Sequence, residues 1–110
     1  MVKSIVWLGD SLDRLRSFPD RAKEHLGADL KRLQLGNQPF DSRPMKSIAA
    51  GVFELRDRDK CTCYRIIYYM RLCDRIVVLN VFTKNSAKTP LKELLLASRR
   101  LKLLIHEEKI

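Results

Sequence analysis

The stretch RIVVLNVFTKNSAKTP (residues 75–90) decides the fold. Its first half is apolar almost throughout and rich in β-branched residues, which predicts a buried strand at the centre of a sheet. At its end, Thr89 suits the N-cap of a helix and Pro90 suits the first helical position. Lys84 and Lys88 lie between these two parts. The stretch therefore predicts a central strand that leads through a basic loop into a helix.

Two further β-favouring segments precede this strand and are joined to it by short turns. Residues 51–56 (GVFELR) alternate, with Phe53 and Leu55 on one side and charged residues on the other, as in a half-buried strand. Residues 63–72 (CYRIIYYMRL) are also rich in β-forming residues. Together with residues 75–83, these segments predict a three-stranded antiparallel meander.

The N-terminal part predicts one strand and two helices. Residues 4–8 (SIVWL) form a short apolar run without alternation, which favours a strand buried on both faces. A short helix capped by Asp10 or Ser11 follows. A longer helix has Pro19 in its first turn and ends at Gly36. Its apolar residues recur on one side at helical spacing, and they are Ala22, Leu26, Leu30 and Leu33.

The C-terminal part predicts a long helix that begins at Thr89 and Pro90. Its apolar stripe consists of Leu91, Leu94, Leu95, Leu101, Leu104 and Ile105. Residues 37–44 form a loop by composition. The elements together predict an α+β fold in the order β-α-α-β-β-β-α, as one domain over residues 1–110.

The positive charge of the chain is concentrated in its middle. The net charge is +9, and residues 43–88 alone hold ten Lys and Arg against four Asp and Glu. Because this region is predicted to form strands, the excess belongs to an ordered surface. Such a surface suits a polyanion such as nucleic acid, or an acidic protein partner. A solvated basic face that only keeps the protein soluble is the alternative.

Several protein classes are excluded by simple patterns. No apolar stretch approaches the roughly 18 residues that a membrane span needs. The apolar run near the N-terminus is shorter than the apolar region of a signal peptide. We therefore expect a cytoplasmic protein without a membrane partner. The three cysteines are odd in number, and Cys61 and Cys63 have no second pair at metal-ligand spacing. We expect reduced cysteines, no metal site and no cofactor.

The sequence has no common catalytic motif: G-x-S-x-G, a phosphate loop, H-E-x-x-H and a dinucleotide fingerprint are all missing. What remains is a set of cations at strand positions, at strand ends and before the meander, namely Lys46, Arg56, Arg65, Lys84 and Lys88. Arg56 ends one strand and Arg65 begins the antiparallel strand across a turn, so we expect the two to be neighbours. Tyr64, Tyr68 and Tyr69 offer faces that can stack a base, although at least one belongs to the core.

These cations suit metal-independent RNA cleavage by internal attack. The 2′-hydroxyl of the RNA attacks the neighbouring phosphate, so that the protein need not supply a nucleophile. Arginine guanidinium groups can donate two parallel hydrogen bonds to phosphate and stabilise the developing charge. A lysine whose pKa is lowered by neighbouring cations can act as acid or base.

Four motifs in order resemble the RelE/ParE toxins of bacterial toxin–antitoxin pairs, and most closely a phage-derived, HigB-like branch. They are GVFELR (51–56), YRIIYY (64–69), IVVLNVFTKNSAKTP (76–90) and LASRRLK (96–102). The resemblance implies an α/β fold with a twisted antiparallel sheet and a basic concave site. It also implies cleavage of mRNA on the translating ribosome and neutralisation by a cognate helix-turn-helix antitoxin. Operator DNA is expected to be bound only through the antitoxin complex.

The resemblance also assigns roles to individual residues. Arg56, Arg65, Lys84 and Lys88 match basic residues of the family's motifs, and of these we expect Arg56, Arg65 and Lys84 to be catalytic and Lys88 to bind RNA. Their residue types, rather than the resemblance, lead us to expect that Lys46 and Tyr68 also bind RNA. Some ribonuclease members carry lysines where this chain has Val52 and Glu54, and a catalytic tyrosine near the C-terminus of some relatives has no counterpart. Two alternatives therefore stay open: a non-enzymatic inhibitor of a target such as DNA gyrase, and a basic nucleic-acid-binding accessory module.

Overall fold

The computed structural model describes residues 2–85 and 90–108, and within them the order of elements agrees with the sequence. The elements are β1 (Ser4–Trp7), α1 (Ser11–Arg16), α2 (Asp20–Gln34), β2 (Ser42–Pro44), β3 (Val52–Arg58), β4 (Cys63–Tyr69), β5 (Arg75–Lys84) and α3 (Leu91–Glu108). The predicted α+β fold is confirmed. The strand β2 is an addition, because the composition of residues 37–44 predicted only a loop.

The strands form one five-stranded sheet in the order β1-β5-β4-β3-β2. The strands β3, β4 and β5 make the predicted antiparallel meander, and β2 extends it along the outer side of β3. At the other edge, β1 pairs parallel to β5, with Ser4 opposite Arg75 and Trp7 opposite Val78. β5 is thus an interior strand, as expected, although β4 is the middle one. The expected burial of β1 on both faces was wrong: β1 is an edge strand and is at most half-buried.

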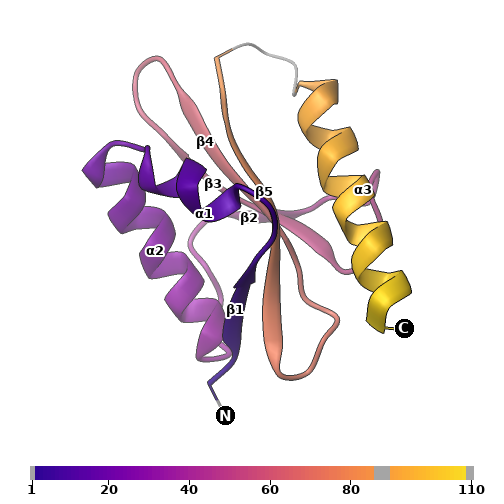
Figure 1. Ribbon diagram of the computed structural model, residues 1–110. Coiled ribbons are helices and arrows are strands. Elements are labelled where there is room, and N and C mark those ends of the chain that lie inside the picture. The colour runs from indigo at the N-terminus through magenta and orange to yellow at the C-terminus, as the bar shows by residue number, and fades with distance from the viewer. Residues whose placement is uncertain (1, 86–89, 109–110) are drawn as a thin grey trace.

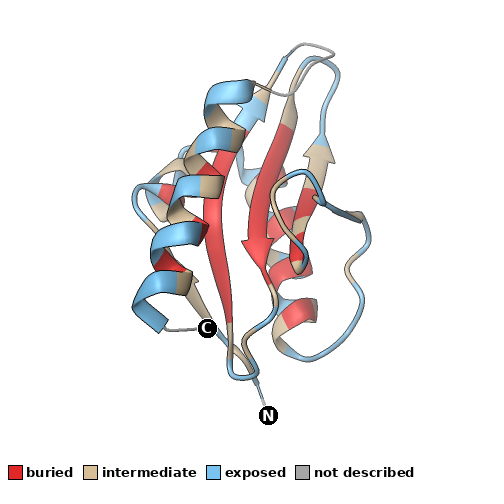
Figure 2. Cartoon of the chain, turned by 90° about the vertical axis from the view of Figure 1, so that its right-hand side faces the viewer, coloured by how far each residue is buried: buried red, intermediate tan, exposed pale blue. Residues whose placement is uncertain are grey.

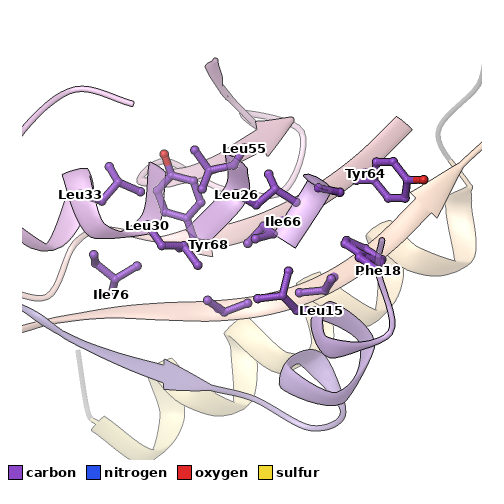
Figure 3. Close-up of a cluster of buried hydrophobic side chains, with 13 residues drawn as sticks. Leu15, Phe18, Leu26, Leu30, Leu33, Leu55, Tyr64, Ile66, Tyr68 and Ile76 are labelled. Carbon is purple, nitrogen blue, oxygen red and sulfur yellow. The ribbon is translucent and has the colours of Figure 1, made fainter. Parts of the chain in front are cut away.

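Both faces of the sheet are covered by helices. Figure 1 shows α1 and α2 on one side of the sheet and α3 on the other. On the α2 side, the predicted apolar residues of the helix are all buried against the sheet. Figure 3 shows Leu26, Leu30 and Leu33 of α2 facing Ile66 and Tyr68 of β4. Fully burying a leucine contributes about 1.5–3 kcal/mol, so this contact is a main source of stability.

The helix α3 covers the other face, chiefly over β5, and Figure 2 shows it crossing in front of part of the sheet. Leu94, Ala97, Leu101 and Leu104 face the sheet, a spacing of three, four and three residues. The predicted stripe was too wide: Leu95 does not fall on this spacing, Leu91 is the first residue of the helix, and both are exposed. Pro90 immediately precedes the helix, and its carbonyl accepts bonds from the first turn. The expected N-cap, Thr89, lies outside the described residues.

A polar network ties α1, β5 and α3 together around Asn80, which is fully buried in the otherwise apolar β5. Arg14 donates to the Glu93 carboxylate (2.8 Å), and the Asn80 amide donates to the Glu93 carbonyl (3.0 Å). Asp10 accepts from both Arg100 and Arg14, each at 2.9 Å. The hydrogen bond from Arg100 lowers the pKa of Asp10. Burial opposes ionisation of Glu93, but bonds from Arg14 and Asn80 outweigh it, so the pKa of Glu93 is also lowered.

Candidate functional site

The register of the sheet brings the predicted arginines together. Arg56 on β3 lies directly opposite Arg65 on β4, and Arg65 lies opposite Phe82 on β5. Residues in register project to the same face of a sheet, and alternate residues along a strand share that face. Since Phe82 belongs to the core on the α3 side, both arginines lie on that side too. The expectation that Arg56 and Arg65 are neighbours is confirmed.

Further cations lie on the same face at neighbouring register positions. Arg58 is opposite Cys63, and Cys63 is opposite Lys84. Arg43, on β2, is opposite Glu54. The basic face is defined here by Arg43, Glu54, Arg56, Arg58, Arg65 and Lys84. It joins five cations to one carboxylate, which favours binding of an anion.

Two of these cations, Arg58 and Arg43, were not predicted from the sequence, for different reasons. Arg58 is two residues after Arg56 on the same strand, so the alternation was sufficient to find it. Arg43 gave no such signal because residues 37–44 carried no strand pattern. Only the pairing of β2 with β3 places Arg43 on this face.

Arg65 is held by a buried ion pair. It is 7% exposed, and its Nη1 donates to Oε1 of Glu54, which is fully buried, at 2.7 Å. The half-buried strand predicted for residues 51–56 put Glu54 on a solvent side, so its burial was not expected. Among the residues that the structure describes, the Nε of Arg65 and the Oε2 of Glu54 are buried and have no hydrogen-bond partner. Orphaned buried polar atoms are costly and mark a site that needs a functional explanation.

Arg56 is in a more open environment. Its Nη2 lies 3.1 Å from the Asp41 carboxylate, and both side chains are substantially exposed to solvent. Such surface ion pairs are weak, at about 0–1 kcal/mol. An anionic ligand can therefore compete with Asp41 for this guanidinium group.

The other predicted site residues are not gathered in the same place. Lys46 is exposed in the turn after β2, near the opposite end of β3. Tyr68 is 1% exposed and belongs to the α2-side core, where its hydroxyl pairs with Ser42 at 2.9 Å. Tyr68 cannot stack a base beside Arg65, because side chains alternate between the two faces of a strand and these two residues lie on opposite faces of β4. Tyr64 and Tyr69 are buried as well. Lys88 lies outside the described residues.

A cavity of about 520 Å³ adjoins the two arginines at the edge of the sheet. One wall comes from α2 and the chain that follows it, and the other from the ends of β3 and β4. Its lining residues are His25, Ala28, Asp29, Arg32, Phe40, Asp41, Arg56, Asp57, Arg58, Cys63 and Arg65. The cavity thus straddles the edge of β3 just beyond the short strand β2. Local sequence patterns do not predict this cavity, since it depends on contacts between distant segments.

The cysteines of the described ranges do not form disulfides. All three cysteines are free thiols, with Cys61 and Cys73 exposed and Cys63 half-buried. Within residues 2–85 and 90–108, no three His, Cys, Asp or Glu side chains group as metal ligands. In the same ranges, no helix has the length and apolar character that crossing a membrane requires.

The family model described as Phage derived protein Gp49-like (DUF891) matches residues 13–102. The match extends from α1 into α3 and includes every residue of the basic face. The chain belongs to the Gp49-like family. This family is RelE-type and toxin-like and occurs in toxin–antitoxin systems, which supports a toxin with an antitoxin partner. No curated protein matches the Gp49-like chain.

Proposed function

We propose that this Gp49-like protein is a HigB-like toxin of a type II toxin–antitoxin system that cleaves mRNA on the translating ribosome. The observation that carries the proposal is the register pairing of Arg56 with Arg65, with Lys84 and Arg58 in the next row of the same face. A concentrated set of cations beside an open cavity suits a phosphodiester backbone. The toxin is kept inactive by a cognate helix-turn-helix antitoxin, and it contacts operator DNA only through that complex.

In the proposed reaction, the 2′-hydroxyl of the RNA loses its proton and attacks the adjacent phosphorus. The bond from phosphorus to the 5′ oxygen breaks, leaving a 2′,3′-cyclic phosphate and a 5′-hydroxyl that takes up a proton. Arg56 contacts the phosphate directly. The guanidinium group of Arg65 adds positive charge from below the protein surface, and its bond to Glu54 fixes its orientation. Preorganised charge of this kind stabilises the transition state more than the substrate.

The test is inducible expression in bacteria followed by mapping of mRNA 5′ ends. We expect cuts at codon-phased positions. Arg56→Ala should reduce cutting by about 10²–10³-fold, the effect of removing one donor that stabilises transition-state charge. The matched control is Arg99→Ala, because Arg99 is exposed on α3 and is not part of the basic face. Uncut mRNA with the wild-type protein, in cells that stop growing, rules out the endonuclease.

A second candidate is inhibition of a target such as DNA gyrase without catalysis. The observation that favours it is the pairing of Arg65 with Glu54, which neutralises one of the two central arginines. This candidate predicts intact mRNA together with stalled replication or DNA damage after induction. The same expression experiment therefore separates the two.

A further inference from the structure

Phe40 is the most exposed large apolar side chain among the described residues, at 83%. It lies in the segment between α2 and β2 and lines the cavity at the edge of β3. Single exposed apolar residues are common on proteins and need no explanation by themselves. This ring is unusual because the structure also fixes its position.

Three linked contacts position Phe40: one on its ring, one on its backbone, and one between the two residues that make them. Asp29, only 4% exposed, accepts from Nη1 of Arg32 at 2.8 Å and from the backbone N–H of Phe40 at 3.0 Å through the same oxygen, Oδ1. The guanidinium carbon of Arg32 lies 3.8 Å from the centre of the ring. The guanidinium group thus covers one face of the ring. Because the residue remains so exposed, the other face is available to a ligand.

The same cavity contains groups suited to a phosphate. Arg56, Arg58 and Arg65 line it together with Phe40, and Arg56 makes a weak surface ion pair with Asp41. An aromatic platform beside phosphate-binding arginines matches the two parts of a nucleotide, the base and the phosphate. A neutral peptide would use the apolar ring but would bring no anion to compete with Asp41 for Arg56.

We propose that this cavity is a nucleobase subsite, in which one base of single-stranded RNA stacks on the open face of Phe40. The phosphate attached to that nucleotide contacts Arg58, which lines the same cavity. The choice of RNA as the ligand rests on the proposed ribonuclease function. Base stacking here fixes where the strand lies relative to the basic face, and therefore where it is cut.

The experiment compares two ligands by titration calorimetry of the purified protein: 5′-AMP, and ribose 5-phosphate, which lacks the base. Wild-type protein should bind 5′-AMP about tenfold more tightly, the scale of one base–aromatic stack. Phe40→Ala should abolish this preference and leave the affinity for ribose 5-phosphate unchanged. Arg58→Gln should weaken both ligands. Leu35→Ala, at another exposed apolar residue just after α2, is the matched control and should keep the preference.

Three results decide against the subsite. The first is equal affinity of the wild-type protein for the two ligands, and the second is no binding of 5′-AMP up to its solubility limit. The third is a Phe40→Ala protein that keeps the preference but loses affinity for its antitoxin, which assigns the ring to protein docking. The mapping of mRNA ends is independent of this titration. Base-dependent binding without mRNA cleavage overturns the ribonuclease alone, and cleavage without base-dependent binding overturns the subsite alone.

Discussion

At the scale of single residues, Glu54 and Arg65 determine what the basic face can do. Glu54 removes one unit of positive charge from the basic face while it fixes Arg65 in place. A buried ion pair contributes little net stability, because removing two charges from water costs about as much as their attraction returns. Its value here is the fixed position of a guanidinium group below the surface.

We expect Glu54→Ala to destabilise the protein by about 3–5 kcal/mol, because it leaves a buried arginine without its partner. The double substitution Glu54→Leu with Arg65→Met should restore most of that loss, since it replaces both charges with apolar side chains. Urea unfolding of the purified variants measures both values. The double variant should be folded but unable to cleave mRNA. Equal loss of stability in the single and double variants would contradict this account of the pair.

Two glycines allow a test of backbone conformation without a change in contacts. Gly36 ends α2 with a φ of +82°, and Gly27 lies inside the same helix; a Cβ at either position would meet no atom within 4 Å. Gly36→Ala should cost about 1–2 kcal/mol, because left-handed backbone strains other residues. Gly27→Ala should instead stabilise the protein by about 0.5–1 kcal/mol. Thermal unfolding of the two variants checks the opposite signs, and a shared sign would be inconsistent with this reasoning.

At the scale of elements, α3 is held by two different kinds of contact. Its buried side packs against β5 through apolar residues, while Arg100 and Glu93 join the network around Asn80. Arg14 of α1 reaches the same carboxylate of Glu93, so that both helices are connected through one buried strand. The attachment of α3 therefore depends on ionised carboxylates as well as on apolar burial.

This network should make stability sensitive to acid. Because the pKa of Glu93 is lowered in the folded protein, its contribution is fully present above the ordinary value of 4.5 and is lost as the pH falls through the lowered value. Glu93→Gln should therefore reduce stability at neutral pH and flatten its dependence on pH below 4.5. Denaturant unfolding across this acid range is the measurement. Glu107→Gln, an exposed position on the same helix, is the control, and a similar flattening there would refute the assignment.

At the scale of the whole molecule, the charge is distributed unevenly over a sheet that is covered on both faces. The net charge is +9, and five cations belong to the basic face. If single-stranded RNA binds there, raising the salt concentration should weaken binding. The reason is that binding releases salt counterions from the RNA, and this release is less favourable at high salt.

Removing one phosphate contact should reduce the slope of log affinity against log salt by about 0.7. We expect this change for Arg58→Gln, on the basic face, and no change for Arg99→Gln, on the exposed side of α3. Fluorescence anisotropy with a short labelled RNA at several salt concentrations gives both slopes. Equal slopes for the two variants would show that the RNA does not bind at the basic face.

The sequence predicted those elements whose side chains repeat with a clear period. The leucines of α2 and the alternation of β3 located the core, and strand order along the chain made Arg56 and Arg65 neighbours. Other features depend on contacts between distant segments, which local patterns do not encode. These include the burial of Glu54, the short strand β2 and the contact of Arg32 with Phe40. The exposed Leu91 and Leu95 show the same limit, since apolar character alone does not set which side of a helix meets the sheet.

The parallel pairing of β1 with β5 also has a consequence for how the protein is made. Ser4 has no strand partner until the segment around Arg75 has been synthesised, so the sheet cannot be complete before β5 has been made. Contacts this distant along the chain also slow folding, because closing a long loop costs entropy before the contact forms. Because Lys84 lies at the end of β5, we expect the basic face to be complete only after β5 has been synthesised.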